Sequence, residues 1–373
     1  MADFIPVNVP VLDGNEKAYL ARCIETGWIS SEGPAVREFE EKLAAQVGRT
    51  FGVAVSNGSA ALELAVRALH LAAGSEVIMP AFTIISCAAA IVRAGLVPVL
   101  VDADPVTWNM DPSQVEGRVT AKTTAIMVVH IYGLPTDMAP ILEIAARHNL
   151  KIVEDAAEMH GQTYRGKPCG SFGEISGFSF YPNKHITTGE GGMILMDDAE
   201  LAERCRSLRN LSHSPDRRFL HEELGFNYRL TNLQAAVGLA QLERLRESVK
   251  KKRQIGAYYD ARLSGIEELE RPPSRVDYAE NIYWVYGMVL SDAVRYDADE
   301  MRSRLGQLGV GTRPFFWGMH EQPVLQRMGL FSGEHYPVTE RISRRGFYIP
   351  SGLGITEEQQ SRVVDAVKQA LRM

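Results

Sequence analysis

Residues 125–157, AIMVVHIYGLPTDMAPILEIAARHNLKIVEDAA, contain two short apolar runs on either side of a helical pattern at 138–148. The run AIMVV is continuous rather than alternating, which is typical of a strand that is buried on both faces of a sheet. Because a parallel neighbour can be reached only by a crossover, the stretch predicts a βαβ unit.

The same rhythm extends toward the N-terminus from this stretch. The apolar runs FGVAVS (51–56), EVIMP (76–80) and VPVLVD (97–102) alternate with helical patterns that begin at Ser59 and near residue 85. On the C-terminal side, GFSFYP (177–182) and GGMILMD (191–197) predict two further strands before a helix near 198–209. The chain is therefore expected to be an α/β protein with a mainly parallel sheet between helices.

Beyond residue 230 the pattern changes. A long helical pattern covers 231–264, and the strand-like runs YWVYGMVL (283–290) and GVGTRPFF (309–316) stand among helical patterns at 298–308 and from 356. This mixture predicts a smaller C-terminal α+β domain. We expect a large domain at 1–245, with an N-terminal arm at 1–30, and a small domain at 246–373.

Composition limits the class of protein. The chain has 373 residues, 45% of them hydrophobic, which is ample for a sizeable core. Forty basic and forty-six acidic residues give a net charge of -6, which argues against a nucleic-acid-binding protein. The one basic run, at 250–253, falls inside the long helical pattern and is interpreted as a solvated helix face without a function.

The sequence also bears on location and on metals. No stretch approaches the roughly 18 apolar residues of a membrane span, and the first residues lack the pattern of a secretory leader. The four cysteines lie far apart and form no CxxC or Cys/His cluster, so no disulfide framework and no metal site are expected. A soluble, cytoplasmic protein without membrane or nucleic-acid partners is the expectation.

A lysine stands among small and hydroxyl residues in Ser179-Phe-Tyr-Pro-Asn-Lys184-His-Ile-Thr-Thr-Gly. A lysine amine can form a Schiff base with an aldehyde, and it can move protons if burial lowers its pKa. A surface lysine in a glycine-rich loop explains this segment equally well. In the segment Lys151-Ile-Val-Glu-Asp155-Ala-Ala-Glu158, acids follow a strand at the edge where open α/β sheets bind ligands. A carboxylate there can keep a pyridine nitrogen protonated, although a helix N-cap is an equal alternative for Asp155.

Two further segments can hold an anion. Val55-Ser-Asn57-Gly58-Ser59 joins a strand to a helix start, where free N–H groups favour a phosphate, although Asn-Gly-Ser is also an ordinary turn. In Gly225-Phe-Asn227-Tyr-Arg229-Leu-Thr231, the threonine suits a helix N-cap, whereas the asparagine and the arginine suit a phosphate or a carboxylate. Neither GxGxxG nor GxxxxGK[ST] is present, which argues against nicotinamide and ATP sites.

Together and in this order, the four segments resemble the DegT/DnrJ sugar aminotransferases, within the aspartate aminotransferase-like, fold-type I pyridoxal-phosphate enzymes. The resemblance covers almost the whole chain. It implies that pyridoxal 5′-phosphate is the cofactor, with pyridoxamine phosphate as an intermediate, and that glutamate donates an amino group to C4 of a nucleotide-linked keto-sugar such as GDP-4-keto-6-deoxymannose, for polysaccharide synthesis. It also implies a homodimer with shared active sites.

The resemblance assigns roles residue by residue. Lys184 is expected to carry the Schiff base and Asp155 to face the pyridine nitrogen, with Glu158 beside the ring. Gly58, Ser59, Ser179 and, from a second subunit, Asn227 are expected to hold the phosphate. His320, Arg229, Trp317 and His185 are expected near the substrate.

One departure from the family pattern lies at Ile84 in Pro80-Ala-Phe-Thr-Ile84, where the family often has an aromatic residue over the cofactor ring. An aliphatic side chain can cover the ring without the stacking contribution. Two alternative functions are a sugar dehydratase on the same scaffold, in which a histidine replaces the lysine, and a cofactor-binding regulatory protein without turnover.

Overall fold

The computed structural model describes residues 4–214 and 216–373, and its largest feature is a twisted sheet of seven strands. These strands are β1 (Phe51–Val55), β2 (Glu76–Pro80), β3 (Val97–Val101), β4 (Thr123–Val129), β5 (Lys151–Asp155), β8 (Ile175–Ser179) and β9 (Gly192–Met196). Their order is β1-β9-β8-β5-β4-β2-β3, and β9 alone runs antiparallel to its neighbours β1 and β8. The expected α/β class with a mainly parallel sheet is confirmed.

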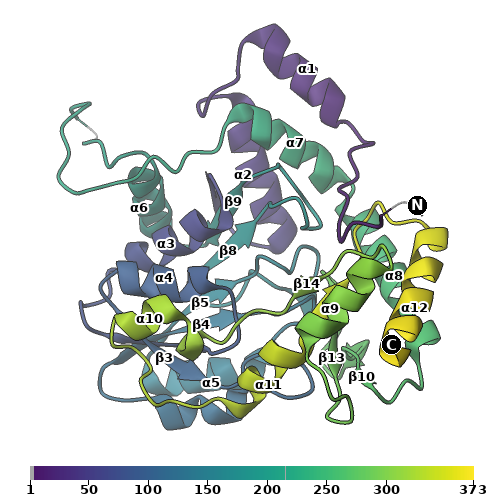
Figure 1. Cartoon of the computed structure of the whole chain (residues 1–373). Coiled ribbons are helices and arrows are strands. Elements are labelled where there is room, and N and C mark those ends of the chain that lie inside the picture. Colours follow the sequence, from purple (N-terminus) through teal and green to yellow (C-terminus); the bar gives the residue numbers. More distant parts are fainter. Residues whose placement is uncertain (1–3, 215) are drawn as a thin grey trace.

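Helices cover both faces of this sheet (Figure 1). They are α2 (Pro34–Val47), α3 (Gly58–Ala68), α4 (Ile85–Arg93), α5 (Met138–His148), α6 (Ala199–Arg209) and α7 (Asn232–Glu243). One apolar core joins the sheet to α3, α4 and α6, and a second core on the other face joins it to α2, α5 and α7. In β4, Met127 belongs to the first core and Val128 to the second, as expected for a strand that is buried on both faces.

The long helical pattern at 231–264 is two helices rather than one. The first is α7, which begins with the expected cap at Thr231, completed as a capping box by Gln234. The second is α8 (Leu245–Leu263). Between them Arg244 leaves helical geometry at φ −106° and ψ 9°, and its side chain pairs with Asp13 and Glu247. The prediction of one continuous helix is wrong, because Arg244 pairs with Asp13 in the N-terminal segment. The spacing of apolar residues along the sequence carries no information on this contact.

A second sheet lies in the C-terminal part of the chain. Its four strands, in the order β10-β13-β15-β14, are β10 (Leu269–Glu270), β13 (Tyr286–Leu290), β15 (Gly346–Ile349) and β14 (Arg313–Pro314). All its pairs are antiparallel, and a core of its own joins it to α8, α9 (Ala298–Gln307) and α12 (Glu357–Arg372). Ile5 is part of this core, so the N-terminal segment packs against the C-terminal half.

The remaining elements are short or peripheral. They are α1 (Glu16–Thr26), α10 (Pro323–Arg327), α11 (Pro337–Arg345), the hairpins β6 (Thr163–Tyr164) with β7 (Lys167–Pro168) and β11 (Arg275–Val276) with β12 (Ala279–Glu280), and the 3-10 turns η1 (Pro112–Gln114), η2 (Glu116–Arg118) and η3 (Met319–Glu321). Helix α1 and the segment between α6 and α7 extend outward from the body (Figure 1). None of the described helices combines the length and hydropathy needed to cross a bilayer.

The basic run at 250–253 is not a uniformly solvated face. Lys250 and Lys251 are exposed, as expected, but Lys252 is only 4% exposed. Its Nζ donates to the backbone carbonyls of Trp284 (2.7 Å) and Ser351 (2.6 Å). The interpretation of the run as solvent-facing is therefore wrong at Lys252, because the helix turns this position toward two carbonyls that need donors.

Candidate active site

A cavity of about 780 Å³ opens at the carboxyl edge of the large sheet, where the strands end and the following loops begin. The parallel strands all end at this edge, which brings together residues far apart in the sequence. Seven of the residues expected at the cofactor line this one cavity: Gly58, Ser59, Ile84, Asp155, Glu158, Ser179 and Lys184.

Lys184 has its amine at the wall of the cavity, and its side chain is 9% exposed. The Nζ atom lies 3.7 Å from a carboxylate oxygen of Glu158 and 3.7 Å from the centroid of the Trp284 ring. Burial lowers the pKa of this amine, and the nearby carboxyl groups of Glu158 and Asp155 oppose that shift. A lysine with a lowered pKa is a better nucleophile and proton carrier at neutral pH than an exposed one.

Asp155 is the last residue of β5 and is buried. One carboxylate oxygen accepts from the N–H of Ala157 at 3.0 Å, and the other accepts from the thiol of Cys87 at 3.3 Å. Burial raises the pKa of this carboxyl group, while the two donors and the amine of Lys184 lower it. Among the described residues no helix begins directly after Asp155, so the N-cap alternative is wrong, and the acid faces the cavity.

Glu158 lies one turn further along the same loop. Its carboxylate accepts from the backbone N–H of Tyr132 at 2.7 Å and approaches Lys184. Burial raises the pKa of Glu158 to about 8. A proton can therefore reside on either partner of this buried pair near neutral pH, which suits a site that moves protons.

The N-terminus of α3 closes one end of the cavity. Asn57 caps this helix by accepting from the N–H of Ala60 at 2.8 Å. The hydroxyl of Ser59 lies 2.6 Å from that of Ser86, and a Cβ on Gly58 would lie only 2.7 Å from the Cβ of Ser179. A capped helix start with hydroxyl groups and a close backbone approach is a suitable anion site.

Pyridoxal phosphate fits these residues. The cavity offers a buried amine for the aldehyde, a buried carboxyl group for the pyridine nitrogen and a helix start for the phosphate. The side chain of Ile84 is 44% exposed at the cavity wall, where an apolar ring can lie against it. These four features are the chemical requirements of the cofactor.

The other residues proposed from the sequence lie outside this cavity. Asn227 is exposed, and Arg229 donates to Asn210 at 2.7 Å and lines a separate hollow beside α6. Trp317 is exposed on the surface. His320 is buried against Glu340 and Tyr336.

His185 points away from the cavity on the far side of Lys184. Its Nε2 is 3.3 Å from the carbonyl of Ile282, and burial holds the pKa of its imidazole well below the usual range. The adjacent lysine therefore faces the site and the histidine does not.

Among the residues missed by the reasoning from sequence, Trp284 and Phe316 line the cavity, and Cys87 donates its thiol to Asp155. Trp284 comes from a segment interpreted only as a strand and Cys87 was interpreted only as a buried thiol, whereas Phe316 directly precedes the expected substrate residue Trp317. No local signal marks Trp284 and Phe316 for the cavity, because their place there depends on how the C-terminal sheet packs against the large one.

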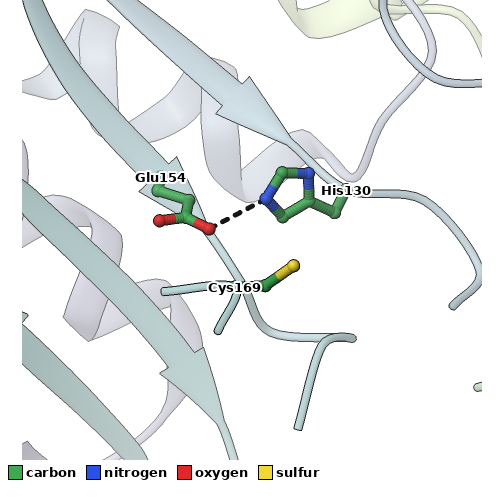
Figure 2. A group of neighbouring side chains, drawn as sticks. All are labelled: His130, Glu154 and Cys169. Atoms are coloured by element: carbon green, nitrogen blue, oxygen red, sulfur yellow. Dashed lines mark hydrogen bonds and ion pairs between the residues drawn. The ribbon is translucent and has the colours of Figure 1, made fainter. Parts of the chain in front are cut away.

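A buried group of His130, Glu154 and Cys169 lies behind the site (Figure 2). Thr136 donates its N–H to Nδ1 of His130, so Nε2 carries the proton and donates to Glu154 at 2.9 Å. Both oxygens of Glu154 also accept backbone N–H groups. Burial and the nearby Glu154 raise the pKa of the Cys169 thiol well above its usual value. The side chains of His130 and Glu154 are engaged in these hydrogen bonds, through which they brace the loops that follow β4 and β5.

Comparison with known proteins supplies the family. The model of the DegT/DnrJ/EryC1/StrS aminotransferase family matches residues 10–368. The chain belongs to this family. It is a pyridoxal-phosphate-dependent aminotransferase, and the fold class expected from the sequence is confirmed.

Three relatives illustrate the similarity. The chain is 41% identical over 367 residues to a GDP-perosamine synthase of Caulobacter vibrioides, covering 98% of both chains. It is 35% identical to the putative pyridoxal phosphate-dependent aminotransferase EpsN of Bacillus subtilis, covering 97% of this chain and 95% of the relative. The crystal structure of S. venezuelae DesV has a TM-score of 0.90 at 32% identity and covers all of both chains.

Proposed function

We propose that this aminotransferase moves the amino group of L-glutamate to C4 of GDP-4-keto-6-deoxymannose or a closely similar nucleotide-linked keto-sugar. The observation that carries the chemistry is the buried amine of Lys184 in the same cavity as the carboxyl group of Asp155. The similarity to a GDP-perosamine synthase over 98% of both chains supports the choice of sugar. We further propose that the product is used in a polysaccharide such as an O-antigen, and that the enzyme works in the cytoplasm.

The residues of the cavity divide the work. Lys184 would hold the cofactor through its amine, and the same amine would take a proton from the substrate carbon and return it. When bound, the cofactor supplies an electron sink for the carbanion that forms at the donor's α-carbon. Asp155 keeps the pyridine nitrogen protonated, and Glu158 exchanges a proton with Lys184.

The remaining residues bind and orient. Gly58, Ser59 and Ser179 hold the phosphate at the start of α3, and Ile84 covers one face of the ring. The imidazole of His320 holds its loop through Glu340, so Phe316 of the same segment, which lines the cavity, is the nearer candidate for substrate contact. His185 supports Lys184 from behind, and Trp317 belongs to the outer part of the substrate site.

We also propose a homodimer with shared active sites. Asn227 and Arg229 lie on the returning end of the segment between α6 and α7, where they form bridges with Asn210 and Val55, and neither lines the cavity of its own chain. From this position we infer that they serve the phosphate and the substrate of the neighbouring subunit. The division into domains at 1–245 and 246–373 belongs to the same proposal. The core of the C-terminal sheet supports it, while the first core of the large sheet also takes in residues of the C-terminal part such as Val289 and Phe315.

The test has two stages. The purified protein with pyridoxal phosphate is mixed with L-glutamate alone, and the visible band of the cofactor should give way to the ultraviolet band of its aminated form. GDP-4-keto-6-deoxymannose should then restore the visible band and gain an amino group by mass spectrometry. Lys184→Ala should lose both changes, while the exposed control Lys250→Ala should retain them.

The outcomes separate the alternatives. A deoxygenated sugar as product would mean a dehydratase, and a cofactor band that glutamate leaves untouched would mean a binding protein without turnover. Amination of other nucleotide keto-sugars, with the GDP compound left unchanged, would keep the reaction and overturn the substrate.

A further inference from the structure

The turn at Tyr283 and Trp284 forms one wall of the catalytic lysine's surroundings. The indole face of Trp284 lies over the Nζ atom of Lys184, and its Nε1 donates to the backbone carbonyl of Asn183 at 2.9 Å. Trp284 therefore contacts both the amine and the backbone of the residue before it. A shift of this ring would change the surroundings of the amine.

The backbone of this turn is held in an unfavourable geometry. Tyr283 has a φ of +49°, in the left-handed region that residues with side chains seldom adopt. Such a residue costs on the order of 1–3 kcal/mol and persists only where surrounding contacts fix it. Part of the fixing comes from Tyr283 itself, whose N–H donates to Asn281 and whose hydroxyl donates to Asp260.

Helix α8 supplies the rest of the support. Gly256 lies against the Tyr283 ring so closely that a Cβ would come within 2.4 Å of it. One turn earlier on the same helix, the buried Nζ of Lys252 donates to the carbonyl of Trp284 and to that of Ser351. No ion pair of the described residues involves Lys252, and the amine is held by these two backbone carbonyls.

We propose that Lys252 is a positioning residue, which holds the strained turn so that the Trp284 ring stays against the amine of Lys184. The inference rests on the proposed role of Lys184 and adds a residue from the small domain to the same site. Removing the Lys252 amine leaves two buried carbonyls without a donor, and the turn can then relax toward ordinary geometry.

The proposal predicts the direction in which the pKa of the Lys184 amine should change. An aromatic face over an amine favours its cationic form, so loss of the ring should lower the pH at which the amine or its cofactor adduct releases a proton. Loss of a nearby positive charge would act in the opposite direction. The other titratable groups around Lys184 are Glu158, Asp155, His160 and His185. Lys252→Met leaves these four side chains in place and removes a charge that helps to lower the pKa of His185.

The experiment compares Lys252→Met with the control Lys251→Met, which removes the same charge from the exposed face of the same helix. The visible band of the bound cofactor is titrated with pH. We expect the midpoint to fall by about half a unit in Lys252→Met and to stay unchanged in the control. In a Trp284→Leu background, Lys252→Met should add little, because the ring through which it acts is gone.

A second readout works without the cofactor. Trace labelling of Lys184 with an amine-reactive reagent across the pH range, read by peptide mass spectrometry, should show the same shift in the cofactor-free chain. If Lys252→Met does not fold, Lys252→Leu, which likewise removes the donor, takes its place.

An unchanged or raised midpoint in the folded Lys252 variant would overturn the proposal, whatever its thermal stability. Failure of the wild-type protein to bind pyridoxal phosphate would instead overturn the proposed function, and the labelling profile would still test the link between Lys252 and Lys184.

Discussion

The carboxyl group of Asp155 is buried with one backbone N–H and one thiol as donors, and Asn has nearly the same shape. We expect Asp155→Asn to fold and to keep the visible band of the cofactor, because Lys184 is intact. Turnover should fall by about a hundredfold or more, because a neutral amide does not keep the pyridine nitrogen protonated. Absorbance spectra and steady-state rates check the two parts separately.

Cys87→Ala is the matched comparison for this variant. It removes only the thiol donor to Asp155 and should therefore reduce turnover much less. Equal losses from the two substitutions would contradict the role of the carboxyl group.

Glu158 makes the stability of the cofactor-free protein depend on pH. Burial raises its pKa from 4.5 to about 8, so between these values the folded chain keeps a proton that the unfolded chain has lost. Stability then falls as pH rises through this window. Relative to Glu158→Gln, the wild-type melting temperature should drop by about 2 °C or more between pH 5 and pH 8.

The exposed variant Glu25→Gln serves as the control and should follow the wild type across this range. A constant difference in melting temperature between wild type and Glu158→Gln would show that Glu158 is ionised in the fold at all these pH values.

At the scale of single elements, the start of α3 packs against the end of β8 through Gly58. Because a Cβ there would lie 2.7 Å from that of Ser179, Gly58→Ala must push the helix start away from the strand. We expect about tenfold weaker binding of pyridoxal phosphate, measured by titration of the cofactor-free protein. Gly117→Ala in η2, where a Cβ would meet nothing within 4 Å, should leave the affinity unchanged.

Local patterns predicted most elements but not all of their junctions. The helix at 138–148, the cap at Thr231 and the strands of the large sheet follow from apolar spacing and from capping residues. The break at Arg244 and the burial of Lys252 depend on partners more than 30 residues away, Asp13 and Trp284. Cavity residues at the ends of parallel strands were predictable, because the carboxyl ends of such strands meet at one edge of the sheet. Trp284 and Phe316 come from the C-terminal part of the chain, to which this argument does not apply.

At the scale of the whole molecule, the proposed sharing of active sites between two subunits predicts complementation between inactive variants. Lys184→Ala and Asn227→Ala should each be impaired alone. When mixed after mild dissociation, the hybrid dimer has one site with an intact lysine and an intact partner asparagine, so about a quarter of all sites should recover. Steady-state activity of the mixture checks this.

Sedimentation velocity of the wild-type protein gives its mass in solution and so tests for a dimer independently of activity. Lys184→Ala and Asp155→Asn form the matched control. Both residues lie on the cavity of one chain, so each site of the hybrid dimer carries one of the two changes and the mixture should recover nothing.

Strand β5 ends in two consecutive acids that face opposite sides of the sheet. Glu154 accepts from His130 (Figure 2) and from backbone N–H groups on one side. Asp155 faces the cavity on the other side. Because successive side chains of a strand alternate, inserting or deleting one residue in β5 would exchange the two carboxyl groups. The residue that holds the fold, Glu154, and the residue that faces the cavity, Asp155, are thus neighbours in the sequence. A change of length is therefore tolerated more readily in the loops around β5 than in the strand itself.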